Sequence, residues 1–356
     1  MTSRNVQRSQ AAPLQLHRAK ITVWLFVLIL LGVACVVLAC GVGSASSFGF
    51  GESMQALLGG GTPGQRIIVR QLRLPRALLA YLVGGALATS GVMLQALFKN
   101  PMADPHILGV SAGAGLGATF AMVFGMQLGG LNALWAGLGT GMIAVCAFTG
   151  GLLAVFLVYS ISQTGGRTST TGLLLSGVVV STLLSSLMSI IMIFNRDKME
   201  HVMLWTLGSF ASANWSKVTW AAPLIVSGLL LCWGLGRDMN LMLFGESQAR
   251  MMGVATRKVR LWVLAFTSLM TAGSVAMSGI IGFVGLIVPH ITRLLTGPDH
   301  RVLIPFAFLG GGVFMLLMDT LARTLMSPLE IPVGVLTAIC GGPFFLYLLR
   351  SRKQVM

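Results

Sequence analysis

Few residues in this chain could carry out ion or proton chemistry, and the acidic ones in or near apolar stretches are Asp104, Asp319 and Glu330. Only Asp319 lies deep within an apolar run, where a proton- or sodium-coupled carrier keeps its ionisable groups. Arg323 follows it by four residues, which is one helical turn, so the spacing favours a structural ion pair. A secondary transporter driven by an ion gradient stays the alternative function.

Motifs that bind metals or nucleotides are also missing from the sequence. There is no His-Glu-x-x-His and no Gly-x-x-x-x-Gly-Lys-[Ser/Thr], so the chain does not itself cradle nucleotide phosphates. The five cysteines are scattered through apolar runs, where cysteine is usually a small packing residue. His106 and His290 each follow a proline, and a helix-end hydrogen bond is favoured over metal ligation. We therefore expect a protein that is not an enzyme and binds no metal or other cofactor.

The composition indicates that these residues are positioned by membrane-spanning helices. Hydrophobic residues make up 55% of the 356 residues and charged residues only 9%, against about a quarter in a soluble domain. The mean hydropathy is +0.86. The net charge of +15 would suggest a nucleic-acid partner for a soluble protein, but most basic residues lie in short links between apolar runs. No nucleic-acid partner is expected.

Apolar runs predict an all-α polytopic membrane protein with about ten transmembrane helices. The first span lies in the uncharged stretch from Ile21 to Gly51, and the others are near 77–97, 107–127, 131–159, 171–194, 219–236, 259–279, 281–295, 303–322 and 333–349. Residues 1–20 form a polar, basic cytoplasmic leader, residues 21–350 a single transmembrane domain, and residues 351–356 a cytoplasmic tail. With both termini inside, 16 of the 24 Lys and Arg residues face the cytoplasm, as the positive-inside rule requires.

Two features are not explained by this topology alone. Half of the outer charge lies between Arg66 and Arg76, against the sorting rule, which indicates another role. Gly109, Gly113 and Gly117 recur at steps of four residues, so they share one helix face and predict close packing against a neighbouring helix.

Several segments in order along the chain resemble the FecCD family of permeases, the membrane subunits of type II ABC importers for iron chelates, haem and cobalamin. They are Gln71–Arg76, Gly91–Gln95, Lys99–Pro105, Trp205–Phe210 with Trp215, Phe244–Gly253, Gly279–His290 and Ile331–Phe345. The resemblance implies the type II permease fold and a homodimer in the bacterial inner (plasma) membrane. It also implies two cytoplasmic ATPase subunits, which hold ATP and magnesium, and a periplasmic or surface-tethered substrate-binding protein. An iron siderophore is the expected passenger, with haem or cobalamin next.

The resemblance also assigns a coupling segment, at about residues 240–256, that would transmit ATPase motion. The matching residues are Phe244, Gly245, Glu246, Ala249, Arg250, Met252 and Gly253. Phe244, Met251 and Met252 would form an apolar knob, with Glu246 and Arg250 as polar anchors. The alternative is a surface helix at the membrane edge.

Two further sets of residues match the family's functional positions. Arg73, Arg76 and Arg323 match arginines that meet acidic residues of the binding protein in the family's cobalamin importer, for which the planar guanidinium fork is suited. Their alternatives are contacts with lipid phosphates or capping of the second span. The hydroxyl residues Thr168, Ser169, Thr170 and Thr171 match a stretch near the family's cytoplasmic gate, and helix N-capping is the alternative.

Overall fold

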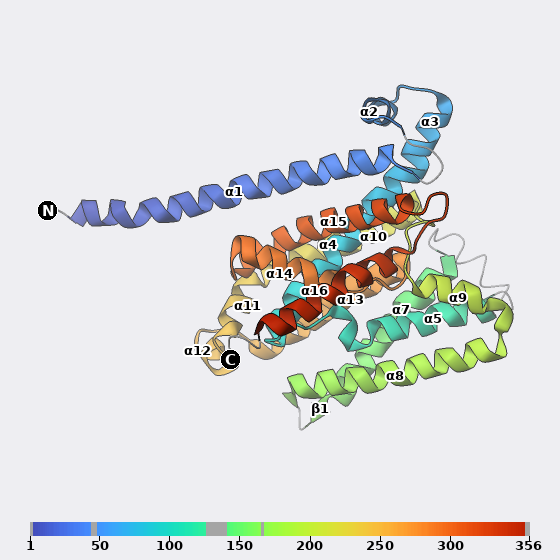
Figure 1. Cartoon of the computed structure of the whole chain (residues 1–356). Helices are drawn as coiled ribbons and strands as arrows, with labels where there is room; N and C mark the ends of the chain where they lie inside the picture. Colours follow the sequence, from blue (N-terminus) through green and yellow to red (C-terminus); the bar gives the residue numbers. More distant parts are fainter. Residues whose placement is uncertain (1–2, 44–47, 126–140, 165–166, 353–356) are drawn as a thin grey trace.

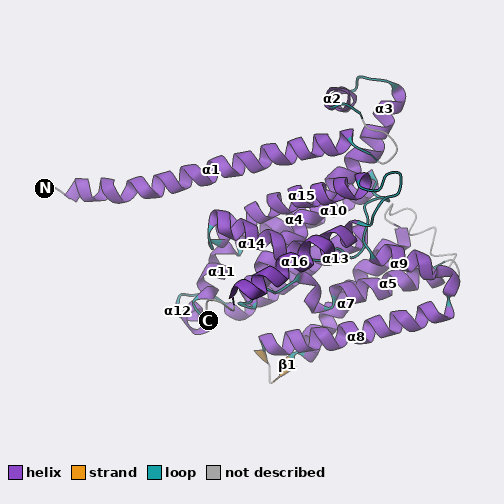
Figure 2. Ribbon diagram, in the orientation of Figure 1, coloured by secondary structure: helices purple, strands orange, loops and turns teal. Residues whose placement is uncertain are grey.

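The structure is a computed structural model that describes the backbone of residues 3–43, 48–125, 141–164 and 167–352. It is almost entirely helical (Figures 1 and 2). The first half contains α1 Ser3–Gly41, α2 Phe50–Leu58, α3 Pro63–Ile67, the π-helical η1 Ile68–Arg73, α4 Leu74–Leu97, the 3-10 turn η2 Pro105–Leu108, α5 Val110–Phe124 and α7 Gly141–Ile161. Two antiparallel strands of two residues each follow, β1 Gln163–Thr164 and β2 Arg167–Thr168. The second half contains α8 Thr170–Phe194, η3 Arg196–Lys198, α9 Met199–Thr206, α10 Trp215–Gly234, α11 Gly236–Leu243, α12 Glu246–Met251, α13 Thr256–Ser278, α14 Val284–Thr296, α15 His300–Thr324 and α16 Val333–Arg352.

The predicted spans correspond to helices of this structure. Among the residues that the structure describes, seven helices are long and apolar enough to cross a membrane, and three shorter apolar helices lie at α5, α14 and the Val333–Tyr347 part of α16. Each of the ten predicted spans therefore contains a helix, although residues 131–140 of the fourth span lie outside the described residues. The all-α prediction is confirmed.

The second span differs most from its prediction, because its helix starts well before residue 77. The chain is helical from Pro63 through α3, η1 and α4 to Leu97. Thr62 begins it with a capping box: its hydroxyl accepts a hydrogen bond from the Gln65 N–H, and the Gln65 side chain accepts one from the Thr62 N–H. The arginine cluster that lowers the local hydropathy is thus part of the same helix, not of a loop.

Short helices in the middle of the fold are accompanied by irregular backbone. The 13 residues of α14 rise only about 20 Å, less than the thickness of a bilayer core. Residues 279–283, which precede it, are not helical, and Ile281 is buried. Such backbone is tolerated at membrane depth where protein covers it.

Helix α4 is the centre of the packing, since nearly all its residues from Leu79 onward are buried against α10, α13, α14 and α15. Helices α5 and α7 pack closely at Gly113 and Gly117, as the glycine spacing predicts, but Gly109 lies before α5 with a φ of +82° and takes no part in this close approach. A Cβ on Gly113 would lie 2.3 Å from the Gly150 carbonyl oxygen, and one on Gly117 would lie 2.1 Å from that of Cys146. Only glycine allows the two backbones this approach.

The two ends of the helical body carry different features. Both termini, α12 and the β1–β2 hairpin lie at one end, which we call the inner end after the predicted topology (Figure 1). The short helices α2, α3 and α9 lie at the opposite, outer end. Helix α1 extends beyond the other helices at the inner end, so the basic leader from Ser3 onward continues the helix of the first span.

Candidate functional site

The predicted coupling segment forms two short helices, α11 and α12, at the inner end of the molecule (Figure 1). Gly245 joins them with a φ of +118°, and Gly253 follows α12 with a φ of +87°. Residues with a side chain rarely adopt either backbone conformation. Ala249 is fully buried and attaches α12 to the body. The family's glycines are thus at the two sharp turns that shape this segment.

Three apolar side chains of the coupling segment are exposed. Phe244 is 68% exposed, Met251 is 80% exposed and Met252 is 48% exposed. This set, which we call the apolar knob, lies at the inner end and not on the sides of the long helices. Exposed apolar groups at such a place are typical of a contact surface for another protein.

The two predicted anchors of the segment have different partners. Glu246 forms an ion pair with Arg260 of α13, whose side chain is mostly buried. Arg250 lies 3.7 Å from Glu246, one turn away, and its own side chain is mostly exposed. Glu246 therefore holds α12 to the body, while Arg250 faces outward. Sequence reasoning did not single out Arg260, because the two partners are 14 residues apart and on different helices.

At the outer end, Arg73, Arg76 and Arg323 come together in one cluster, with Asp319 and Glu330. Arg76 donates to both carboxylate oxygens of Asp319, the shortest contact being 2.9 Å, and to Glu330 at 2.9 Å. Arg323 lies 3.2 Å from the other side of Asp319. The predicted ion pair between Asp319 and Arg323 is confirmed, and Arg76 is a second partner that joins α4 to α15.

The cluster also binds the end of the first span. Arg73 Nη1 donates to the carbonyl oxygens of Cys40 and Gly41, both at 3.0 Å, and its guanidinium lies 4.7 Å from the centre of the Phe48 ring. Arg323 Nη1 donates to Val42 at 3.0 Å and to Ala39 at 3.3 Å. The last carbonyls of a helix have no partner within it and carry partial negative charge, which arginine satisfies.

In this single chain the three arginines are therefore bonded to groups of the same molecule. Arg73 and Arg323 are buried, and the Arg76 side chain is 12% exposed. Arg66, in contrast, is exposed on α3. Docking of a binding protein on Arg73, Arg76 and Arg323 stays a prediction, and Arg76 is the least buried of the three.

The predicted gate residues lie at the inner start of α8. Ser169 is the N-cap of α8, and its hydroxyl accepts a hydrogen bond of 2.8 Å from the Gly172 N–H. Thr170 and Thr171 begin the helix, while Thr168 ends β2 and its side chain is not described. The capping interpretation of Ser169 is confirmed. The gate role of the four residues stays a prediction.

His106 is bonded at the η2–α5 junction, where its main-chain N–H donates to Asp104 Oδ1 at 2.8 Å and its Nε2 lies 3.9 Å from the same carboxylate oxygen. Its Nε2 lies 2.9 Å from the Ile281 carbonyl oxygen, and its Nδ1 contacts the Ser111 hydroxyl. Ser111 also stands in a Gly-x-Ser-x-Gly pattern, Gly109–Gly113, which sequence reasoning overlooked. A nucleophile elbow requires a preceding strand, but here a 3-10 turn precedes the serine. The pattern is therefore part of the packing of α5.

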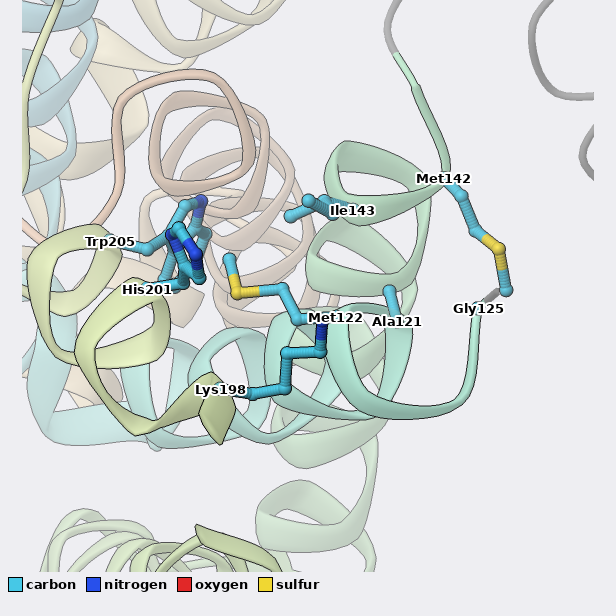
Figure 3. Close-up of a pocket in the computed structure, with 8 residues that line it drawn as sticks. All are labelled: Ala121, Met122, Gly125, Met142, Ile143, Lys198, His201 and Trp205. Atoms are coloured by element: carbon cyan, nitrogen blue, oxygen red, sulfur yellow. The ribbon is translucent and has the colours of Figure 1, made fainter. Parts of the chain in front are cut away.

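Two cavities lie between α5 and its neighbouring helices. One of about 490 Å³ lies at the outer end between α5, α7 and α9, and Figure 3 shows its side chains. Its lining residues are Ala121, Met122, Gly125, Met142, Ile143, Lys198, His201 and Trp205. A second, of about 260 Å³, is bordered by His106, Ser111 and the α8 hydroxyls of Ser181 and Ser185. Within the described residues, no group of three His, Cys, Asp or Glu side chains is placed to hold a metal ion.

Comparison with known proteins shows which family this chain resembles in sequence. The model of the FecCD transport family matches residues 21–351. The cobalamin import permease BtuC of Halobacterium salinarum is 43% identical over 294 residues, covering 81% of this chain and 74% of that protein. The hemin transport permease HmuU of Yersinia pestis is 40% identical over 285 residues, covering 80% and 83%.

A solved structure supports the same assignment. An inward-facing metal-chelate type ABC transporter superposes with a TM-score of 0.78 at 34% identity, covering 92% of this chain and 98% of the other. The coupling segment and the outer charge cluster both lie within residues 21–351, which the family model matches. The chain belongs to the FecCD transport family and is a multi-pass membrane permease of an ABC importer.

Proposed function

We propose that this permease forms the translocation path for a metal chelate, an iron siderophore first, with haem or cobalamin next. The relatives named for cobalamin and hemin import support a bulky chelate as passenger. Methionine and aromatic side chains around the outer cavity, such as Met122, Met142 and Trp205, offer an adaptable surface that does not bind one ligand tightly. The permease acts in the bacterial inner membrane with both termini in the cytoplasm.

The observation that carries the ATP-driven part of the proposal is the apolar knob of Phe244, Met251 and Met252 at the inner end. A cytoplasmic ATPase subunit would close on this knob, and Glu246 with Arg260 would pass its movement into α13. ATP and magnesium belong to that ATPase, because the permease sequence has no phosphate-binding loop. Two permease chains, two ATPase subunits and a substrate-binding protein at the outer end make up the importer.

Reconstitution tests this function directly. The permease is placed in liposomes with its ATPase and binding protein, and uptake of haem, cobalamin and ferric siderophores is measured with and without ATP. We expect uptake of one chelate that stops when ATP is omitted. Uptake that ignores ATP and follows a proton or sodium gradient would overturn the proposal.

A further inference from the structure

The coupling segment has a second attachment to the body, at Asn240 of α11. The Asn240 Oδ1 accepts a hydrogen bond from the His300 N–H at 2.9 Å and another from the His300 ring at Nδ1, at 2.7 Å. The Asn240 Nδ2 donates to Asp299 Oδ1 at 2.6 Å. These three bonds, which we call the Asn240 joint, connect α11 to the first residues of α15.

Each hydrogen-bonding group of the joint faces a partner of the opposite kind, donor to acceptor. Asp299 is the N-cap of α15, where its Oδ1 also accepts from the Arg301 N–H at 3.0 Å. Partial burial acts to raise the pKa of Asp299, but the hydrogen bonds from Arg301 and Asn240 hold that pKa below its ordinary value. The carboxylate is therefore ionised near neutral pH and needs a donor, which only the amide group of Asn240 supplies across the joint.

His300 is fixed by the same side chain. Because the Asn240 oxygen is an acceptor, the His300 Nδ1 must carry the ring hydrogen. The Nε2 is then an acceptor, and it is buried with no hydrogen-bond partner in the described part of the chain. The imidazole is thus held from the α11 side alone.

We propose that Asn240 is a positioning residue that transmits movement of the coupling segment to α15. This inference rests on the proposed function as an ATP-driven importer. Three bonds at one side chain fix both the position and the orientation of α11 against α15. The other polar attachment, between Glu246 and Arg260, holds α12 to α13, so the two helices of the segment pull on different parts of the body.

Exchanging the amide of residue 240 with the carboxylate of residue 299 tests the joint while keeping the size of both side chains. Asn240→Asp keeps the acceptor for His300 but places a second carboxylate against Asp299, so the joint opens by repulsion. Adding Asp299→Asn restores the pair with donor and acceptor exchanged, and asparagine also caps a helix well. Asn240→Ala is the second single variant, since it removes the joint without adding charge. Trp233→Phe is the matched control, because the Trp233 Nε1 donates to the Arg301 carbonyl from α10 rather than from the coupling segment.

The measurement is chelate uptake per ATP hydrolysed by the complete importer in liposomes, together with thermal unfolding and retention of the ATPase on the permease. We expect Asn240→Asp and Asn240→Ala to lower the uptake ratio about 5-fold or more while ATP hydrolysis and ATPase retention persist. The double variant and Trp233→Phe should lie within about 2-fold of the unsubstituted chain.

The outcomes separate this inference from the proposed function. A ratio unchanged in both single variants overturns the inference, and so does a folded double variant that stays as low as Asn240→Asp. Loss of ATPase retention in proportion to the loss of uptake would also overturn it, because the joint would then only shape the docking surface. If the unsubstituted chain shows no ATP-dependent uptake, the proposed function itself fails.

Discussion

The two charged regions of this molecule use their residues in opposite ways. At the inner end, the coupling segment leaves Phe244 and Met251 exposed and keeps Arg250 at the surface. At the outer end, Arg73 and Arg323 are buried and bonded to carbonyl groups and to Asp319. The inner region is therefore arranged for a partner, whereas most of the outer region holds the fold together.

This difference shows that residue type alone does not separate docking from structure. Arginine forks suit a partner's carboxylates, but they suit the chain's own carboxylates and helix-end carbonyls equally well. The exposed fraction of each side chain and the identity of its partners decide between the two roles. Substitutions in the two regions should therefore change different properties of the protein.

The largest effect is expected at Asp319, on the stability of the permease. Asp319→Ala leaves Arg323 and part of Arg76 buried without their counter-charge, which should lower the free energy of unfolding by about 3–5 kcal/mol. Thermal unfolding of the purified chain measures it, with the exposed Glu200→Ala as control. A normally stable Asp319→Ala permease whose complete importer hydrolyses ATP but fails to transport would contradict the structural role.

The next effect is expected at Phe244, on binding and not on stability. Because the ring is 68% exposed, Phe244→Ala should change the free energy of unfolding by less than about 0.5 kcal/mol. Loss of a central apolar anchor should weaken ATPase association by about 2 kcal/mol, or roughly 30-fold. Titration of the ATPase onto permease in nanodiscs measures this. Leu230→Ala is the control, because Leu230 is an apolar residue of α10 that is 56% exposed. Equal weakening by both variants would show that the knob has no special role.

A smaller effect at Ser169 separates capping from gating. Ser169→Ala removes the acceptor of the Gly172 N–H and should cost about 1 kcal/mol of stability. Ser169→Asp keeps an N-cap, so it should restore stability, but it adds a charge at the predicted gate and should slow uptake. If uptake simply follows stability in both variants, Ser169 is a cap and the gate prediction fails at this residue.

The sequence allowed the spans and the coupling segment to be predicted because both depend on local pattern. Apolar runs marked each transmembrane helix, and the spacing of Gly113 and Gly117 marked a packing face. The start of the second span was misplaced because hydropathy falls at the arginines, although Thr62 and Gln65 carry a capping signal that could have corrected it. Local signals were sufficient here, but hydropathy was given too much weight.

The partners of the polar side chains could not be predicted in the same way. Arg76 meets Asp319 across 243 positions, and Asn240 meets Asp299 across 59. Such contacts depend on how α4, α11 and α15 pack, and the sequence pattern of each helix contains no information on this. The spacing of Asp319 and Arg323 revealed one ion pair only because both residues lie on one helix.

The smallest expected effect tests whether any of the outer cluster is available to a partner. Glu330 is partly exposed and accepts a hydrogen bond from Arg76 Nη1 at 2.9 Å, and Arg76 is the least buried of the three docking candidates. If Arg76 binds a carboxylate of the binding protein, Glu330 competes for the same guanidinium, so Glu330→Gln should strengthen association by up to about 1 kcal/mol, or roughly 5-fold. The gain should shrink at high salt, since screening weakens exposed pairs. Association measured at low and high salt decides this: an unchanged affinity, with a small loss of stability, would mean that Arg76 serves the fold alone and that docking depends on other cations such as Arg66.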